Sequence, residues 1–376
     1  MKTEMAQHSS PNRRRILVLH ATYQLGGAER VLQRLLTSLS PRLDVYACAL
    51  YELGSVGEQL QQVGVPIYAL HGRSRTDWRV LLRVIKLVRQ TRPGVVFTID
   101  SPYPLLYAVL LRRLGLVPKL VVSVRTFAKT HRQREMAIAR RLASGVVDVL
   151  IALSETQKRL LLEAEGWRAR RVVVIPNGID LQRFSPHGEN LREQWRLSPK
   201  TPTFGTVSML RPEKNISLFL RVAQRVLRTM PQARAFVVGD GVQRAALEQM
   251  AEQMNIQQQV VFTGVIEDIP AVWRTLDVAV LTSRVEGLPN VLIEAAACGV
   301  PAVSTDVGAV RDVVLDGETG FVVPLQEEDT LAERILYLLQ HPDERKRMGE
   351  HAHQHAEAYF DLRQMVERYA QVLEDA

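Results

Sequence analysis

The feature that most constrains the fold of this 376-residue chain is an alternation that runs from one end to the other. Short runs rich in Val, Ile and Leu alternate with amphipathic segments of helical length, such as 28–39 and 79–91. Continuous apolar runs are typical of parallel strands buried on both faces, and their alternation with helices predicts a doubly wound α/β sheet. The first series of runs is RILVLHA, LDVYACALY, VVFTID, KLVVSV, VDVLIAL and RVVVIPNG.

The alternation begins again after a polar stretch at 185–201, with TPTFGTVSML, RAFVVGDG, VVFTGV, VAVLTS, PAVSTDV and GFVVP. Because the chain is also too long for one compact core, we expect two Rossmann-like domains, 1–185 and 186–361. Ligands of such sheets bind at the carboxyl ends of the strands, so two facing domains would enclose a cleft. The last helix, 362–376, either completes the second domain or returns to the first, and the sequence leaves both open.

The composition of the chain indicates the cellular compartment in which it works. The longest apolar region, PLLYAVLLRRLGLVPKLVVSV, is interrupted by three charges and a proline, so it does not resemble a spanning helix of about 20 apolar residues. The N-terminal RRR is followed only by a strand-like run, which does not predict a signal peptide. Two cysteines are too few for a disulfide framework. These features predict a cytoplasmic protein.

Charge is divided unevenly along the chain. Residues 1–185 hold 29 Lys and Arg against 13 Asp and Glu, a net +16, whereas 186–376 hold 19 against 27, a net −8. The first half is thus expected to face an anionic partner, such as an acidic lipid surface, a phosphorylated acceptor or nucleic acid, unless its basic helices are merely solvated. Within it, RTFAKTHRQREMAIARRL (125–142) mixes cations and apolar residues as helices lying on anionic lipid do.

Two carboxylates flank a turn in the second half, in EGLPNVLIEAAACG. The chain leaves a strand, turns through Gly287 and Pro289, and enters a helix for which Asn290 is the predicted N-cap. A helix N-terminus at this place is a ready anion site. Glu294, one turn into the helix, is suited to accept hydrogen bonds from vicinal hydroxyls, as acidic residues do for ribose in dinucleotide-binding folds. Glu286, in the loop, could accept hydrogen bonds from a sugar ring in the same way. On spacing alone, the alternative is equally good: Glu294 would be a solvated helix residue and Glu286 a turn residue, with no ligand.

Two cations follow another strand, in GTVSMLRPEKN. Arg211 and Lys214 are separated by a turn that Pro212 fixes, and together they can neutralise a diphosphate. If that diphosphate is a leaving group, the same charges stabilise the transition state. A solvated basic turn is the alternative.

Two glycine-bearing loops join strands to helices. Gly26 and Gly27 lie in the first domain, and Gly239 and Gly241 flank Asp240 in the second. Neither loop has the G-x-G-x-x-G or G-x-x-x-x-G-K-[ST] pattern, which argues against NAD or ATP. Glycine at these places still permits a close backbone approach to a ligand.

The segments LGGAERV, VIPNGIDLQRF, LRPEKN, VVGDG and EGLPNVLIEAAACGVPAV occur in an order and spacing that resembles the retaining, GT-B-fold glycosyltransferases of family four, also described as glycosyl transferases group 1. The resemblance covers almost the whole chain, and its most specific part is the E-x₇-E block. It implies a sugar donor linked to a nucleoside diphosphate, UDP or GDP, with no other cofactor and no metal.

The resemblance also implies roles for individual residues. Arg211 and Lys214 would hold the donor diphosphate, Glu286 the transferred sugar and Glu294 the ribose. Pro289, which has no N–H, would contribute only its carbonyl to donor binding. The further donor-binding candidates are Gly27 from the first domain and Gly239, Gly241, Gly287, Leu288, Pro289 and Asn290 from the second.

The chain departs from the family pattern in the first domain. Many members carry a His where this chain has Arg125, and His131 lies six residues further on. Arg125 would instead suit an anionic acceptor or the donor phosphate. Asp100 ends a strand and either binds acceptor hydroxyls or caps a helix. These three residues are the acceptor-site candidates.

The function predicted from these features is a metal-independent, retaining glycosyltransferase with a lipid-linked or surface-polysaccharide acceptor and no nucleic-acid partner. It is expected in the cytoplasm, with an anionic surface on the inner face of the cell membrane as a further partner. No residue stands out as a covalent nucleophile, which favours attack from the face that the leaving group vacates.

HAHQH has metal-ligand spacing but no acidic or Cys partner nearby, and a solvated helix is preferred. A nucleotide-sugar epimerase and a non-catalytic sugar-nucleotide-binding protein are the alternatives.

Overall fold

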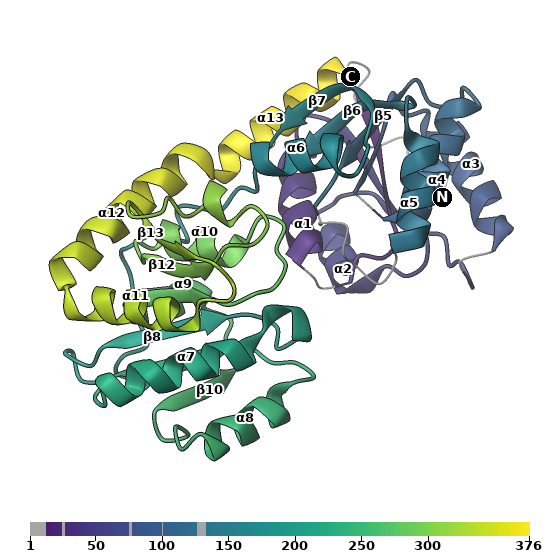
Figure 1. The fold of residues 1–376 in the computed structure, drawn as a ribbon. Coiled ribbons are helices and arrows are strands. Elements are labelled where there is room, and N and C mark those ends of the chain that lie inside the picture. Colours follow the sequence, from purple (N-terminus) through teal and green to yellow (C-terminus); the bar gives the residue numbers. More distant parts are fainter. Residues whose placement is uncertain (1–12, 25–26, 75–76, 100, 126–132) are drawn as a thin grey trace. The chain divides into compact units, whose positions relative to one another are not determined.

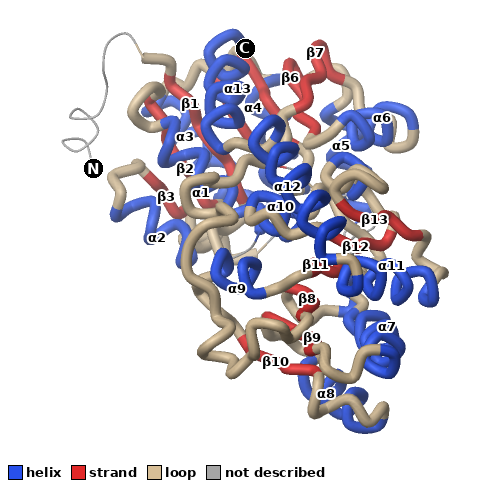
Figure 2. The backbone as a smooth tube through the Cα atoms, turned by 90° about the vertical axis from the view of Figure 1, so that its left-hand side faces the viewer, coloured by secondary structure: helices blue, strands red, loops and turns tan. Residues whose placement is uncertain are grey.

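The computed structural model describes residues 13–24, 27–74, 77–99, 101–125 and 133–376. The chain divides into two compact units, Met1–Gly178 together with Arg363–Ala376, and Ile179–Leu362. Each unit is a parallel sheet with helices against both faces (Figures 1 and 2). The predicted pair of Rossmann-like, doubly wound α/β domains is confirmed.

The first unit has a seven-stranded sheet in the order β3-β2-β1-β4-β5-β6-β7. Its strands are β1 (Arg15–His20), β2 (Asp44–Ala49), β3 (Ile67–Ala69), β4 (Val95–Ile99), β5 (Lys119–Ser123), β6 (Val147–Ala152) and β7 (Ala169–Val174). Its helices are α1 (Gly27–Leu39), α2 (Gly54–Gln62), α3 (Trp78–Thr91), α4 (Pro102–Arg113), α5 (Gln133–Ala143), α6 (Glu155–Glu163) and α13 (Leu362–Asp375). The strand absent from the sequence prediction is β3, a half-buried edge strand too short to form an apolar run.

The second unit has a six-stranded sheet in the order β10-β9-β8-β11-β12-β13. Its strands are β8 (Thr203–Val207), β9 (Arg234–Val238), β10 (Val260–Gly264), β11 (Val278–Leu281), β12 (Ala302–Thr305) and β13 (Gly320–Val323). Its helices are the 3₁₀ turns η2 (Pro212–Lys214) and η3 (Val310–Asp312) and the α-helices α7 (Ile216–Thr229), α8 (Arg244–Gln253), α9 (Ile269–Thr275), α10 (Asn290–Ala297), α11 (Glu328–Gln340) and α12 (Pro342–Tyr359).

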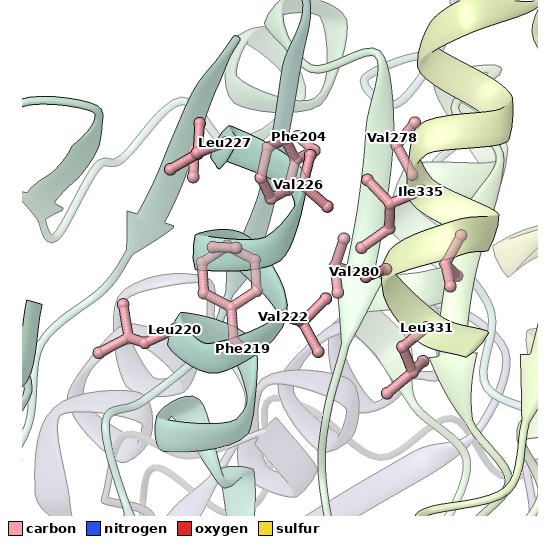
Figure 3. Close-up of a cluster of buried hydrophobic side chains, with 14 of the residues drawn as sticks. Phe204, Phe219, Leu220, Val222, Val226, Leu227, Val278, Val280, Leu331 and Ile335 are labelled. Carbon is pink, nitrogen blue, oxygen red and sulfur yellow. The ribbon is translucent and has the colours of Figure 1, made fainter. Parts of the chain in front are cut away.

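The core of the second unit explains why its strands are apolar throughout. On one face α7 and α11 pack side by side against the sheet, and Figure 3 shows Val222 of α7 and Ile335 of α11 beside Val280 and Val278 of β11. Helices α9 and α12 each pack against α10, which itself lies against β11 and β12. Strands covered on both faces need apolar residues at consecutive positions, which is the pattern read from the sequence.

The boundary between the units lies close to Gly178. The polar stretch from which the sequence placed the junction, 185–201, packs on the second unit, because Leu191 N donates to Thr275 Oγ1 at 2.7 Å and Arg274 Nε to Glu189 O at 2.6 Å. The last helix, which the sequence left unassigned, joins the first unit. There the ring of Tyr369 lies edge-on to Phe97 of β4, with 5.9 Å between centroids.

Each sheet has one place where the strand order reverses. It lies between β1 and β4 in the first unit and between β8 and β11 in the second. At such a point the two connections lead away to opposite sides, which leaves a crevice beyond the carboxyl ends of the strands where ligands bind. The loops that follow β8 and β11 are therefore where the topology alone places a ligand site in the second unit.

Candidate functional site

The loops after β8 and β11 are bonded to each other. Arg284 N donates to Glu213 O at 2.9 Å, and the Thr282 hydroxyl donates to Asn215 O at 3.2 Å. Lys214 and Glu286 lie in these two loops, and the structure brings them together although they are 72 positions apart.

Glu286 is a buried carboxylate with two side-chain hydrogen bonds at this edge of the sheet. It is 9% exposed, and its Oε1 accepts hydrogen bonds from Lys214 Nζ and from the hydroxyl of Ser283, each at 2.6 Å. Ser283 is held in turn, because Thr305 at the end of β12 donates to its carbonyl oxygen at 2.8 Å. A buried carboxylate is costly without hydrogen-bond donors, and here Glu286 has two of them, one from a basic side chain.

Arg211 completes the basic side of the site. It precedes η2 in an extended conformation and is exposed. Within the described chain its guanidinium forms no hydrogen bond or ion pair, in contrast to Lys214. A guanidinium in this state can turn both of its donor edges toward an anion.

Helix α10 begins at Asn290, and its N-cap is Pro289. The prediction of Asn290 as N-cap was therefore wrong by one residue, and the cap provides no side-chain hydrogen bond, since proline has no polar side chain. Leu288 and Pro289 are buried beneath the turn, while Glu294 is half-buried in the second turn of the helix.

The backbone at the start of this turn is fixed from a second side. Ala309 N donates to Gly287 O at 3.0 Å. Gly308 has a φ of +59°, and a Cβ atom there would lie 2.0 Å from Glu286 O. The loop after β12 thus presses on the Glu286–Gly287 backbone and leaves no space for a side chain at Gly308.

Gly239 and Gly241, predicted as donor-binding, are required by the packing of the β9 loop. A Cβ atom on Gly239, whose φ is +125°, would lie 2.0 Å from Ser208 O, and one on Gly241 would lie 2.6 Å from Leu210 O. Leu210 N donates to Asp240 O at 2.9 Å. The close backbone approach that these glycines permit is made to the loop after β8.

Sequence reasoning missed three apolar residues along the same edge. Met209, Val242 and Val265 are 49%, 89% and 76% exposed and follow the adjacent strands β8, β9 and β10. Large apolar side chains in these positions leave an uncovered apolar edge beside the cations. The available signal was their position directly after predicted strands, in loops that otherwise contain polar residues and glycine.

In the first unit Arg125 lies in the interior, at 8% exposed. Its Nη1 donates to Asn177 Oδ1 at 2.6 Å and its Nη2 to the hydroxyl of Tyr369 at 3.1 Å. These bonds join the end of β5 to the segment after β7 and to α13. Gly27 is the first residue of α1, just beyond β1. The other two acceptor-site candidates, Asp100 and His131, lie outside the described residues.

A second pair missed by sequence reasoning lies where the first sheet reverses. His20 ends β1 with 6% exposure, and its Nε2 lies 3.1 Å from Glu29 Oε1 in the first turn of α1. Burial opposes ionisation of Glu29, but the hydrogen bonds with His20 and with the backbone amide of Glu29 itself outweigh burial, and the pKa of Glu29 is lowered. The pair joins the end of β1 to the first turn of α1, and the signal was a polar residue at the end of a predicted strand and another at the start of the next predicted helix.

Two histidines of HAHQH, His353 and His355, contact backbone carbonyls, whereas His351 Nδ1 lies 3.4 Å from Arg347 Nη1. His353 Nδ1 lies 2.8 Å from Ala297 O at the end of α10, and His355 Nε2 lies 3.2 Å from Asp312 O. Within the described chain, no group of three or more His, Cys, Asp or Glu side chains is placed to hold a metal ion. These rings thus cap neighbouring elements.

Helix α3 presents an exposed stripe without an acidic residue. Trp78 and Leu82 are 67% and 54% exposed, and Arg79, Arg83, Lys86 and Arg89 are exposed on the same side. On α5, Ile138 is likewise 59% exposed. Among the described residues, no helix combines the length and the apolarity needed to cross a membrane.

The chain matches two family models that together extend over most of its length. Residues 25–183 match the model described as Glycosyltransferase Family 4, and residues 188–355 match Glycosyl transferases group 1.

Two curated relatives illustrate the range of activities. The UDP-Gal:alpha-D-GlcNAc-diphosphoundecaprenol alpha-1,3-galactosyltransferase of Escherichia coli is 27% identical over 271 residues, 69% of this chain and 70% of the relative. The GDP-mannose-dependent alpha-(1-6)-phosphatidylinositol monomannoside mannosyltransferase of Mycolicibacterium smegmatis is 33% identical over 187 residues, 46% of this chain and 49% of the relative. The second match thus spans about half of either protein.

Among solved structures, Anabaena HepE in complex with UDP has a TM-score of 0.86 to this chain at 20% identity, covering 96% of this chain and 100% of HepE. HepE in complex with UDP-glucose has a TM-score of 0.84 at 22% identity, with coverage of 96% and 100%. At such identity the likeness shows a shared fold.

Proposed function

The chain belongs to the family four glycosyltransferases of GT-B fold, and from that membership we propose that it transfers a sugar, with retention, from a UDP-linked donor to a lipid-linked or surface-polysaccharide acceptor. The observation that carries this proposal is the meeting of Lys214, Glu286 and Ser283 beside an exposed Arg211, where the second sheet reverses its strand order. Such a site offers positive charge for a diphosphate and a fixed acceptor for a sugar hydroxyl.

In the proposed mechanism Arg211 and Lys214 hold the donor diphosphate, Glu294 accepts hydrogen bonds from the ribose, and Glu286 from the sugar. The bond between the anomeric carbon and the diphosphate oxygen breaks, and its electron pair stays on the phosphate, where the two cations stabilise it. The acceptor hydroxyl attacks the anomeric carbon from the same face and gives its proton to the leaving phosphate. The cations supply the charge that a metal would otherwise provide, so we propose that transfer needs no metal.

The choice of UDP over GDP rests on two observations. The E. coli relative is named for UDP-Gal, and HepE was solved with UDP and UDP-glucose. The exposed Met209, Val242 and Val265 suit the apolar face of a nucleobase. GDP is the second candidate, because the mycobacterial relative is named as GDP-mannose-dependent.

The acceptor side of the proposal rests on the first unit. The two curated relatives are named for a diphosphoundecaprenol-linked and a phosphatidylinositol-linked acceptor. The stripe of α3 combines Trp78 and Leu82 with four cations, a composition that favours the interface of an anionic bilayer. These features support our proposal that the enzyme acts at the cytoplasmic face of the cell membrane.

Nucleotide binding tests the donor site directly. We expect UDP, or else GDP, to raise the melting temperature of the wild type, since a ligand at about 100 times its Kd adds about 2.7 kcal/mol to the free energy of unfolding. Glu294→Ala should lose most of this shift. Stabilisation by NAD alone, or an unchanged response of Glu294→Ala, would remove the proposal.

Turnover separates the remaining classes. A glycosyltransferase releases UDP when an acceptor is supplied, and NMR of the product should show the anomeric configuration of the donor. An epimerase would alter the sugar without an acceptor, and a non-catalytic partner would bind UDP and release nothing.

A further inference from the structure

Glu286 uses only one of its two carboxylate oxygens within the described chain. Lys214 Nζ and Ser283 Oγ both bond to Oε1, each at 2.6 Å. An ionised carboxylate oxygen has about two lone-pair directions, so Oε1 is saturated by these donors. Oε2 has no hydrogen-bond partner among the described residues, although the side chain as a whole is 10% exposed.

Because Oε2 keeps access to solvent, a hydroxyl of a ligand can reach it and donate a hydrogen bond. Of the two donors to Oε1, Ser283 is the one that the surrounding protein holds in place, whereas the Lys214 side chain is 25% exposed. Ser283 is 0% exposed, and its carbonyl accepts from Thr305 on the neighbouring strand. The backbone of Glu286 is pressed by Gly308 from the side of the β12 loop. The orientation of the carboxylate, and with it the direction of Oε2, is therefore set by the protein before a ligand arrives.

We propose that Ser283 is a positioning residue that sets sugar specificity. By occupying Oε1 together with Lys214, its hydroxyl directs Oε2 toward one hydroxyl of the donor sugar, and the site then distinguishes a donor from its epimer. This inference rests on the proposed function, because it requires Glu286 to face the transferred sugar. Lys214 alone fixes one bond to Oε1, and a single bond leaves the carboxylate free to rotate about that contact.

The test compares Ser283→Ala with Ser304→Ala. Ser304 is also 0% exposed, lies on the adjacent strand β12 and donates to Thr305 O at 3.0 Å, so the substitution is matched in chemistry and burial. For each variant, kcat and KM are measured with UDP-glucose and UDP-galactose, which differ at one hydroxyl, and the Kd of UDP is measured separately. GDP-mannose and GDP-glucose replace this pair if the wild type binds GDP.

We expect Ser283→Ala to lower kcat/KM for the preferred sugar by about 10- to 100-fold, the range that a small misplacement of a reacting group costs. The preference between epimers should fall at least about tenfold, with kcat more affected than KM, while the Kd of UDP stays within about twofold. Ser304→Ala should retain the wild-type preference.

A purely structural role would lower the turnover of both epimers equally and weaken UDP binding in parallel. That outcome, or a Ser283→Ala enzyme with the wild-type preference, overturns the positioning role and leaves the proposed function standing. A wild type that binds neither UDP nor GDP overturns both.

Discussion

At the scale of single residues, the two cations of the site have different surroundings and should respond differently to removal. Lys214 is bonded to the buried carboxylate of Glu286, whereas the guanidinium of Arg211 forms no bond within the described chain. We expect Lys214→Met to weaken UDP binding and also to destabilise the fold by about 1–3 kcal/mol, because Glu286 loses a charged partner. Arg211→Met should weaken UDP binding with little change in stability.

Calorimetry with UDP and urea unfolding of the two variants measure both quantities. A Lys214→Met protein that is as stable as Arg211→Met would show that the ion pair with Glu286 contributes nothing to the fold.

Gly239 allows the cost of a steric clash to be separated from the cost of backbone conformation. Gly239 and Gly317 both have positive φ, +125° and +79°, but a Cβ atom at Gly317 would meet nothing within 4 Å. Gly317→Ala should cost about 1 kcal/mol, the penalty of a left-handed residue. Gly239→Ala should cost at least about 3 kcal/mol, since the β8 loop must also move. Equal midpoints in urea unfolding would contradict this account.

For the site, the sequence could indicate which residues have suitable side-chain chemistry, but not which of them contact one another. Arg211, Lys214, Glu286 and Glu294 were candidates from charge and position along the chain, and their roles, implied by the family resemblance, stay predictions. The bond between Ser283 and Glu286 could not be predicted, because serine is common in loops and its partner depends on the rotamer. The N-cap prediction failed at Asn290 because Pro289, with its φ fixed, can also precede the first helical residue.

At the scale of elements, one buried carboxylate fastens the amino-terminal edge of the first sheet. Asp148 of β6 is 3% exposed and accepts from Arg112 Nε of α4 at 2.9 Å and from Leu120 N of β5 at 3.0 Å, with Arg170 of β7 at 3.4 Å. Burial opposes its ionisation, but the bonds from Arg112 and Leu120 outweigh burial and lower the pKa of Asp148.

The sign of the pH dependence follows from this lowered pKa. The unfolded chain titrates Asp148 near pH 4, so the carboxylate stabilises the fold above about pH 4, and its contribution is lost as the pH falls from there through the folded pKa. Asp148→Asn should cost about 3 kcal/mol at pH 7, and its difference from wild type should shrink at pH 3. Asp343→Asn, at an exposed position of α12, is the control for urea unfolding at both pH values.

The exposed apolar residues of helix α3 allow the proposed binding to an anionic membrane to be tested. Replacing Trp78 and Leu82 together by Ser should lower binding to vesicles of phosphatidylglycerol and phosphatidylcholine at least about tenfold, because burial of two such side chains stabilises by about 1.5–3 kcal/mol each. Val63→Ser is the matched control, since Val63 is 56% exposed beyond the end of α2. Co-sedimentation at low salt measures the difference. Equal loss in the control would leave α3 without a specific role.

At the scale of the whole molecule, the sequence predicted two sheets and their strands. It did not predict which of the two units the last helix joins. Apolar runs report burial locally, which is why every strand except β3 was found. The assignment of α13 depends on contacts across more than 200 positions, such as that between Ser123 and Tyr369, and no local pattern encodes them. The asymmetry of charge also became interpretable only when the basic residues of α3 were found on one exposed stripe.

Helix α13 packs on the first unit, although it follows the second unit in the sequence. We expect Tyr369 to be the residue that holds it there. Its hydroxyl lies 3.1 Å from Ser123 Oγ and 3.1 Å from Arg125 Nη2, all buried. Tyr369→Phe should cost about 1–3 kcal/mol, because a buried guanidinium loses an acceptor. Hydrogen exchange should then accelerate in α13 and β5, while β8 and β11 keep their protection, since that sheet belongs to the other unit. Tyr359→Phe, at a 60% exposed position, should change neither, and exchange that rises equally in both variants would show that α13 is held by its apolar face alone.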